Sequence, residues 1–471
     1  MLSPAKIAWY QDVEAELQSS GVVDAHNHIL GRKQRLDANP DLFDWIAASY
    51  YLSSLLSSGM NAEEFRARGP NDAIRRWQVL RPHLERTRNC SYAALIDLAT
   101  RDLFQFPFFD LNDRNWPELS ERFRSASKDP QWFETVLGKK MNMQLGLLDG
   151  WAGGNLMCGI SHSGGWYDYI LRARATQDDA SVNRRTIVRE IDTRFFRPVF
   201  KIDSLLYGYG PGCLSEIAQL FKVDVEGGAQ SLSDYLQVVD KCFQRIVALG
   251  GVGIKSAIMG LRTLDFPRTE RSDAERIFGL TPEKRTKLDA IHCENYLMNV
   301  MVEKSIEHHL PFQIHTGTAF AGYSCDDNGR PVHLFNLISQ HPDAQFDLLH
   351  GGYPYSAESA TLAARFPNVY LNFSYFTMHA PNEARRAIAS WIEMIPIHKF
   401  AWGSDCVYVE ETYGAFLQAR RVFADALWDR IEDGWLDKAT ALQFIRAIFH
   451  DNPARLFRTG SRSERVEMAL R

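Results

Sequence analysis

Two histidines that lie two residues apart, His26 and His28, occur in an apolar stretch near the start of the chain, VVDAHNHIL. Residues two apart on a strand point to the same face, so both imidazoles can aim at one point. Imidazole nitrogen is a good ligand for zinc, and manganese and iron are alternatives. Alone, such a pair is more often two hydrogen-bonding residues than two metal ligands.

Three further residues of metal-binding type lie where later apolar stretches end. They are His315 in QIHTG, His350 in LLHGG and Asp405 in AWGSD. Several neutral imidazoles with one carboxylate leave a coordination position open for water, whose pKa a bound metal lowers toward ~7. Asp405 could bind the metal and also accept the proton of the attacking water. Together with the first pair, these residues predict a metal site.

Eight short apolar segments are predicted as strands, and amphipathic helical segments separate most of them. Nearly all stay apolar until their last residues, which is typical of buried parallel strands. This alternation predicts an α/β fold of the (β/α)₈ barrel type, in which the active site lies at the carboxyl ends of the strands. A doubly wound sheet is the alternative, but it more often has five or six strands. The segments are 21–29, 141–149, 197–205, 251–258, 311–317, 344–352, 368–374 and 399–405.

About 110 residues separate the first predicted strand from the second, which is too long for a simple crossover. This segment, 31–138, is aromatic-rich and helical in pattern, so we expect a helical insertion or cap. The barrel itself is then expected to comprise residues 1–30 and 139–471. A second polar excursion, 266–290, follows the fourth strand.

The composition excludes several classes of protein. The chain has 471 residues, a net charge of −5 and 45% hydrophobic residues, so it has ample core material and no basic footprint for nucleic acid. Seven scattered cysteines and the lack of a signal peptide predict a reduced, cytoplasmic chain. No apolar run approaches the ~20 residues that cross a bilayer, so we expect no membrane partner. The aromatic insertion could also bury a homo-oligomer interface.

The segments DAHNHI, QIHTGT, LLHGGYP and AWGSDC, with the tail FHDNPARLF, resemble the amidohydrolase superfamily of metal-dependent (β/α)₈ enzymes. Within it, the chain looks most like the amidohydrolase-2 type group, which contains hydrolases, lactonases and non-oxidative decarboxylases. The long insertion and the segment RPVFKIDSLL are also reminiscent of uronate isomerases.

The resemblance implies two alternative metal sites. In binuclear members a lysine on the fourth strand, here Lys255, is carboxylated and bridges two ions, and His315 and His350 hold the second ion. In mononuclear members the first histidine pair, His315 and Asp405 hold one ion, and His350 instead has a catalytic or supporting role. We therefore expect one or two divalent ions, with zinc first and manganese or iron as alternatives.

Residues after the strand ends are predicted to bind a small, carboxylate-bearing substrate, because phenols and cations suit such a ligand. The predicted function is a hydrolase that acts on an amide, lactone or related bond, with Asp405 and His350 as catalytic residues. A decarboxylase or a uronate-type isomerase is the alternative, and a non-catalytic binding scaffold is a third reading. The expected substrate-binding residues are Arg262, Lys201, Tyr353, Tyr323 and Tyr375.

Overall fold

The fold was analysed in a computed structural model of the chain. The structure describes residues 3–67, 71–150, 191–207, 231–281, 284–319 and 326–459, with isolated residues between 208 and 230. None of the helices in these ranges is long and apolar enough to cross a membrane.

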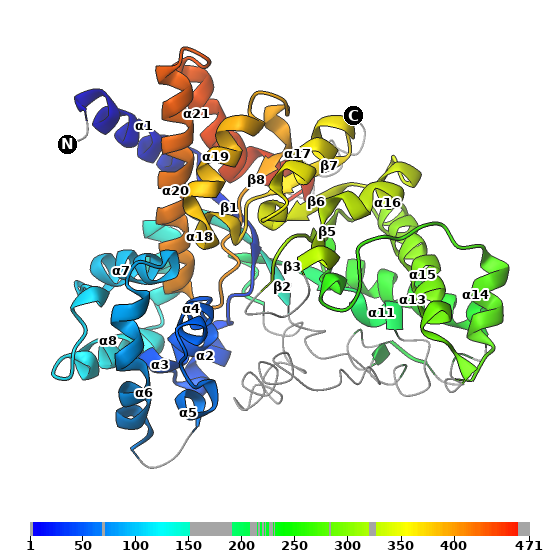
Figure 1. Cartoon of the computed structure of the whole chain (residues 1–471), viewed down its shortest axis with the longest axis horizontal. Coiled ribbons are helices and arrows are strands. Elements are labelled where there is room, and N and C mark those ends of the chain that lie inside the picture. The colour runs from blue at the N-terminus through cyan, green and yellow to red at the C-terminus, as the bar shows by residue number, and fades with distance from the viewer. Residues whose placement is uncertain are drawn as a thin grey trace.

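Eight parallel strands form the centre of the molecule in the order β1 to β8, so the predicted (β/α)₈ fold class is confirmed (Figure 1). Each strand lies within the segment predicted for it or extends it by one residue. The strands are shorter than predicted because their last residues turn into the loops at the carboxyl end. Their bounds are β1 Val22–Asn27, β2 Met143–Gly150, β3 Phe196–Lys201, β4 Gly253–Ser256, β5 Phe312–His315, β6 Phe346–Leu349, β7 Val369–Asn372 and β8 Phe400–Ala401.

The segment that follows β8 runs alongside β1 in the same direction and brings the two edges of the sheet together. The backbone N–H of Asp405 donates to the carbonyl of His26 at 2.8 Å, and that of His28 donates to the carbonyl of Cys406 at 2.9 Å. This close approach requires Gly403, because a Cβ atom there would lie 2.6 Å from the backbone nitrogen of His26. The glycine of the GSD motif therefore lets the strand-eight segment lie against β1.

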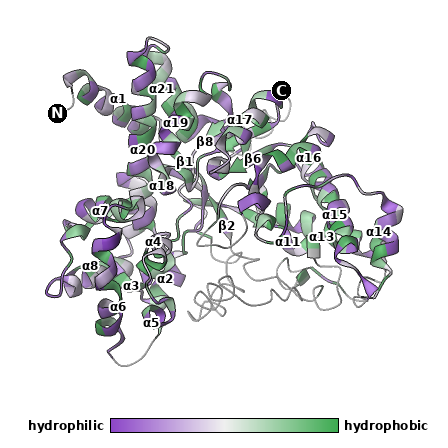
Figure 2. Cartoon of the chain, viewed as in Figure 1, coloured by the Kyte–Doolittle hydropathy of each residue, from purple (hydrophilic) through white to green (hydrophobic). Residues whose placement is uncertain are grey.

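Helices surround the barrel, and Figure 2 shows both hydrophilic and hydrophobic residues on most of them. The polar excursion predicted for 266–290 contains a helix, α14, and the start of another, α15. Both bury an apolar side although many of their residues are charged. The helices that surround the barrel are α11 Asp203–Tyr207, α13 Leu232–Ala248, α14 Arg271–Phe278, α15 Lys287–Glu307, α16 Phe335–Gln340, α17 Ser356–Arg365, α18 Phe376–His379, α19 Pro381–Trp391, α20 Val409–Glu432, α21 Lys438–Arg446 and α22 Asn452–Leu456.

The segment between β1 and β2 forms a helical lobe beside the barrel, drawn in blue and cyan in Figure 1. Helix α7 packs along the long helix α20, which ties the lobe to the barrel. The lobe consists of α2 Arg32–Ala38, α3 Leu42–Ala48, α4 Tyr51–Ser57, α5 Ala62–Arg66, α6 Asp72–Thr87, α7 Ser91–Phe104, η1 Phe108–Asp110, α8 Trp116–Lys128 and η2 Glu134–Lys140.

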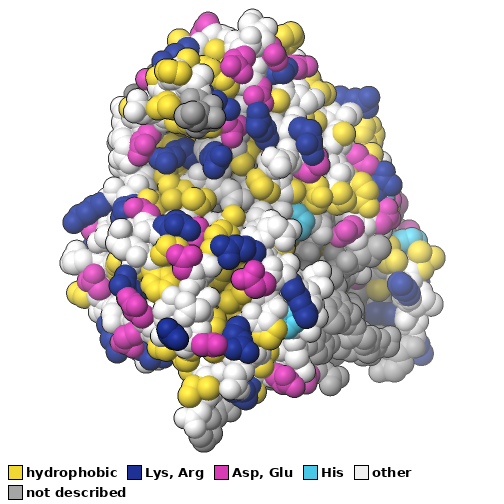
Figure 3. Space-filling model, turned by 60° about the vertical axis from the view of Figure 1, so that its left-hand side comes forward, with side chains coloured by type: hydrophobic (Ala, Val, Ile, Leu, Met, Phe, Trp, Pro, Cys, Tyr) yellow, Lys and Arg dark blue, Asp and Glu magenta, His cyan; other side chains and the backbone are white. Residues whose placement is uncertain are grey.

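A further helix, α1 Pro4–Ser20, precedes the first strand and packs on α20 and α21. The Trp9 side chain of this helix is fully buried, and its Nε1 atom donates to the carbonyl of Ala424 at 2.8 Å. On the face drawn in Figure 3, charged side chains of both signs are scattered among apolar ones. This mixture agrees with the absence of a basic footprint in the sequence.

Candidate metal centre

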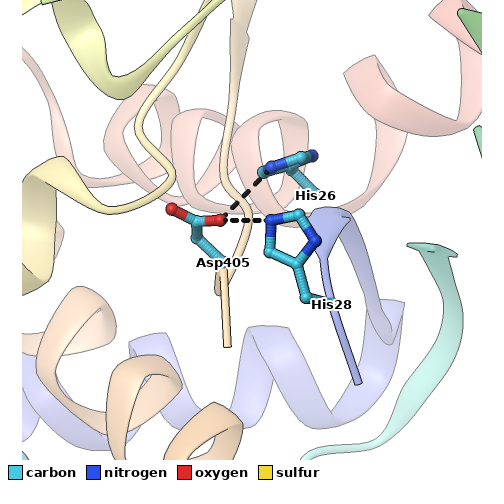
Figure 4. A group of neighbouring side chains, drawn as sticks. All are labelled: His26, His28 and Asp405. Atoms are coloured by element: carbon cyan, nitrogen blue, oxygen red, sulfur yellow. Dashed lines mark ion pairs between the residues drawn. The ribbon is translucent and has the colours of Figure 1, made fainter. Parts of the chain in front are cut away.

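Three of the predicted metal ligands meet where β1 and the segment after β8 lie side by side (Figure 4). The Nε2 atom of His28 is 3.0 Å from Oδ1 of Asp405, and the Nε2 atom of His26 is 3.3 Å from the same oxygen. One potential ligand atom from each residue lies within 4.8 Å of the others. All three side chains are buried or nearly so, because they point into the mouth of the barrel.

The outer nitrogens of both imidazoles are held by acceptors. The Nδ1 atom of His28 is 3.1 Å from the carbonyl oxygen of Asp149, and the Nδ1 atom of His26 is 3.3 Å from Oε1 of Gln313. An acceptor at Nδ1 places the proton there, so Nε2 carries a lone pair. Two lone pairs and a carboxylate oxygen then face one another, an arrangement that a cation stabilises. The donor set therefore fits a divalent metal ion.

The electrostatics of His26 favours its metal-binding form. Burial, with the nearby ammonium of Lys255, lowers the pKa of His26 to about 4, so this imidazole is neutral at pH 7. A histidine that binds a metal must be neutral, and His26 meets that requirement.

A second pair of imidazoles, His315 and His350, lies beside the first. The Nδ1 atom of His315 is 3.1 Å from Nε2 of His350. Their other nitrogens face the carbonyl oxygens of Thr318 and Ser374, each at 3.1 Å, which places the ring protons on the outer side. Burial lowers the pKa of His315 to about 3, so two lone pairs face each other here as well. A proton or a cation between them would relieve that repulsion.

Lys255 on β4 is buried in the same mouth, as the sequence predicted. Its Nζ atom is 2.8 Å from Oδ2 of Asp149 and 3.0 Å from Nε2 of His26. Burial alone would raise the pKa of Asp149, but the Lys255 ammonium outweighs it and lowers that pKa. Asp149 was not singled out in the sequence, although it lies near the end of β2 as the predicted ligands lie near the ends of their strands.

Tyr50 connects the helical lobe to this centre and was not foreseen. Its hydroxyl donates to Oδ2 of Asp405 at 2.7 Å, on the oxygen that does not face the two imidazoles. The Tyr50 ring contacts that of Tyr375 with centroids 4.7 Å apart. The aromatic-rich insertion was the only signal in the sequence, and it does not identify which of its many aromatic residues reaches the barrel.

Of the predicted substrate-binding tyrosines, Tyr375 contacts His350, and both Tyr375 and Tyr353 contact His379. The ring of Tyr375 is 5.7 Å from that of His350, and its hydroxyl is 3.2 Å from Nδ1 of His379. Tyr353 packs edge-on against His379 at 5.3 Å. Tyr323 lies outside the described residues.

The two predicted cationic residues differ in their surroundings. Lys201, at the end of β3, has its Nζ atom 3.7 Å from Oδ2 of Asp203. Arg262 makes hydrogen bonds with all five of its N–H groups, so its predicted contact with substrate would require some of these bonds to break. Its acceptors are the carbonyls of Thr263, Ile291 and Asp265 and the side chains of Glu294 and Asn295.

Three residues of this centre have a positive backbone φ angle. Asp405, His350 and Tyr375 have φ values of 54°, 68° and 63°. Such values are strained for residues other than glycine, and they concentrate at functional sites where the surrounding structure holds them. The strain here belongs to the residues that turn inward after β6, β7 and β8.

Comparisons with known proteins agree with this fold. Residues 269–459 match the model of the family described as Amidohydrolase. Protein fluG of Emericella nidulans is 30% identical over 223 residues, which make up 44% of this chain and 25% of that protein. The chain thus matches about a quarter of the length of that relative.

Two solved structures share the fold over nearly their whole length. The glucuronate isomerase of Caulobacter crescentus has a TM-score of 0.74 at 17% identity, covering 98% of this chain and 96% of that one. The uronate isomerase of Thermotoga maritima has a TM-score of 0.71 at 15% identity, covering 97% and 98%. The amidohydrolase resemblance predicted from the sequence is confirmed, and the family match together with the barrel indicates an enzyme.

Proposed function

We propose that this chain is a metal-dependent hydrolase that uses activated water on an amide, lactone or related bond of a small, carboxylate-bearing molecule. The observation that carries the proposal is the convergence of the Nε2 atoms of His26 and His28 on one oxygen of Asp405. Two imidazoles with a carboxylate suit zinc best, and manganese or iron are alternatives.

The two oxygens of Asp405 suit two different tasks. Oδ1 faces the two imidazoles and would hold the metal ion, which when bound supplies a water of lowered pKa. Oδ2 faces the hydroxyl of Tyr50, and it lies 3.8 Å from Nδ1 of His350. Oδ2 could exchange its hydrogen bond with Tyr50 for one with the water. It could then take the proton of the water and pass it to the leaving group.

The environment of Lys255 favours one ion over two. A lysine that bridges two metals carries a carboxyl group on Nζ, whereas the Nζ atom of Lys255 pairs with Oδ2 of Asp149 at 2.8 Å. The Lys255 amine also lies 3.0 Å from the Nε2 atom of His26, so amine and metal compete for one lone pair. We infer that metal binding leaves the amine paired with Asp149, and that His315 and His350 act on the substrate.

A uronate-type isomerase is the second candidate, and a decarboxylase shares its site requirements. The fold likeness to the glucuronate isomerase covers 98% of this chain, which includes the helical insertion. A uronate needs a cation for its carboxylate. Among the predicted cations, Arg262 is fully engaged with protein acceptors, whereas Lys201 lies at the end of a barrel strand.

A substrate screen on the metal-loaded protein separates these candidates. We expect turnover of an amide or lactone, detected as release of acid, that stops when a chelator removes the metal. Release of CO₂ from aromatic acids, or conversion of a uronate to its keto isomer without hydrolysis, would contradict the hydrolase proposal and select the alternative.

Replacement of Asp405 tests its role in the reaction found by the screen. We expect Asp405→Asn to lower turnover by about 10²–10⁴-fold, since it removes the proton acceptor. Asparagine tolerates a positive φ, so the backbone at φ 54° is kept. Asp429→Asn, which alters a carboxylate that pairs with Arg385 on the outer helices, serves as the control. Near-wild-type turnover in Asp405→Asn would remove the proposed role.

A further inference from the structure

A chain of buried polar side chains runs beneath the metal centre, inside the barrel. It begins at the Nδ1 atom of His26, which faces Oε1 of Gln313 on β5 at 3.3 Å. Gln313 donates from Nε2 to Oδ2 of Asp347 on β6 at 2.9 Å. Asn372 on β7 donates to the same carboxylate oxygen at 3.1 Å. Gln313, Asp347 and Asn372 are all fully buried.

The orientation of the Gln313 amide follows from its partners. Its Nε2 atom lies 2.8 Å from the carbonyl oxygen of Ala25 and 2.9 Å from Oδ2 of Asp347, and both of these are acceptors. An amide has two N–H donors, so both are used and only the oxygen remains for His26. Because that oxygen can only accept, the proton of His26 must lie on Nδ1.

This assignment fixes the metal-binding nitrogen. A neutral imidazole with its proton on Nδ1 has its lone pair on Nε2, the atom that faces Asp405. Turning the Gln313 amide over would set its oxygen against a carbonyl and a carboxyl oxygen, which repel it. The barrel interior therefore selects the ligand tautomer of His26 before any metal arrives.

Among the described residues, no cation lies within hydrogen-bonding distance of the Asp347 carboxyl group. Its Oδ2 atom accepts from two amides, and its buried Oδ1 atom has no hydrogen-bond partner among the described residues. A carboxyl group without a counter-ion is costly to bury, so a purely structural role gives little reason for it. Its position behind the Gln313 amide is that of the carboxylate behind a metal-binding histidine, with one amide inserted between them.

The same carboxyl group is connected to the second imidazole pair. The Oδ1 atom of Asn372 accepts from the backbone N–H of Ser374 at 3.0 Å. The carbonyl of Ser374 lies 3.1 Å from Nδ1 of His350 and places the proton of that ring on its outer nitrogen. Hydrogen bonds thus connect Asp347 to His26 through Gln313. They also connect it to His350 through Asn372 and Ser374.

We propose that Gln313 and Asp347 are positioning residues that hold His26 in its metal-binding tautomer and strengthen its bond to the metal. Neither side chain would touch the metal or the substrate. The inference rests on the proposed metal centre for its effect on affinity. Its effect on the tautomer of His26 does not depend on that centre.

We call the hydrogen-bonded series from Asp347 through Gln313 to His26 the relay. Two substitutions test it, with one control. Gln313→Met keeps the size of the side chain and removes the acceptor for His26. Asp347→Asn keeps the acceptor for Gln313 and removes the charge. The control is Asn368→Leu, because Asn368 is also a buried amide that donates to two carbonyls, those of His341 and Ala344 at 3.0 and 2.8 Å. It precedes β7 at the other end of the barrel, away from the metal centre.

Metal affinity is measured first, by competition of zinc between the protein and a chelating dye. We expect Gln313→Met to raise the Kd for zinc by about 10- to 100-fold, the usual cost of losing such a partner, and Asp347→Asn to raise it by about 10-fold. Asn368→Leu should lower the melting temperature and leave the Kd unchanged. If both relay variants bind zinc as the wild type does, while His28→Ala does not, the relay is overturned and the metal centre stands.

The tautomer is measured in the metal-free protein, from nitrogen chemical shifts of histidine labelled with ¹⁵N. We expect the wild type and Asn368→Leu to show His26 protonated on Nδ1 alone, and Gln313→Met to show a mixture. An unchanged tautomer in Gln313→Met would overturn the relay. If the wild type binds no zinc, the proposed function fails, and this second measurement still decides the relay.

Discussion

Asp405 is the residue on which the chemistry of this site depends, and its two oxygens have different surroundings. One faces the Nε2 atoms of His26 and His28, and the other accepts from the hydroxyl of Tyr50 at 2.7 Å. A charged carboxylate rotates easily unless both oxygens are held. Tyr50 is therefore expected to fix the angle at which Asp405 meets the metal.

Replacement of Tyr50 tests this. We expect Tyr50→Phe to lower kcat/KM by about 10- to 100-fold, because a hydrogen bond to a charged group contributes about 1.5–3 kcal/mol. The neighbouring Tyr51→Phe is the matched control, since Tyr51 is buried and its hydroxyl contacts Thr87 at 2.6 Å, within the lobe. Equal losses in the two variants would show that Tyr50 acts only on the stability of the lobe.

The elements that bring Tyr50 to the barrel are held by a buried ion pair. Arg35 on α2 donates from Nη1 to Oε2 of Glu410 at 2.8 Å, and Glu410 lies in the first turn of α20. Trp132 donates from Nε1 to the other carboxylate oxygen at 2.7 Å. The first turn of α20 begins soon after Asp405, so this pair ties the lobe to the segment that carries the carboxylate ligand.

Breaking the pair should destabilise the whole fold. We expect Arg35→Met to lower the free energy of unfolding by about 3–5 kcal/mol, because it leaves the Glu410 carboxylate buried without a cation. Urea unfolding measures this. The exposed pair Arg271–Glu275 provides the control, and Arg271→Met should cost no more than about 1 kcal/mol. An equally small loss of unfolding free energy in Arg35→Met would contradict the proposal that this pair ties the lobe to the barrel.

The next residue of α20, Glu411, predicts a pH dependence of stability. Burial, together with the nearby charge of Asp405, raises its pKa from 4.5 to about 8. Below pH 4.5 the carboxyl is protonated in both states. Between pH 4.5 and 8 the unfolded chain ionises and the folded chain does not, so stability falls by as much as about 1.4 kcal/mol per pH unit.

Glu411→Gln removes this loss, so the stability of the variant relative to wild type should rise steadily from pH 4.5 to 8. The measurement is urea unfolding of the chelator-treated protein at several pH values, since a bound metal would change the effect of the Asp405 charge on the pKa of Glu411. Parallel pH curves for the two proteins would show that Glu411 is ionised in the folded chain.

Over the whole molecule, the sequence predicted what depends on hydrophobic pattern. All eight strands were located because each is apolar until its polar last residues. The five imidazole and carboxylate positions lie together because parallel strands end at one mouth. The helix in the charged segment 266–290 was harder to predict, because the apolar side of α14 is short and most of its residues are polar.

The contacts that the sequence could not predict are those made by side chains from distant elements. Gln313 is an ordinary residue of an apolar strand until its position next to His26 is known. Tyr50 lies more than 350 residues from Asp405 in the chain, so no spacing relates them. Arg262 looked like a cation for substrate, and only its surroundings reveal that Glu294 and Asn295 hold it.

The most direct test of the account is the metal content of the purified protein after exposure to zinc and removal of free ion. Elemental analysis should find about one ion per chain in the wild type, and none above background in a His26→Ala/His28→Ala double variant that still folds. Two ions per chain, with Lys255 carboxylated by mass, would contradict the single-ion site inferred from Asp149. A wild type without metal, or a double variant that keeps it, would contradict the metal centre itself.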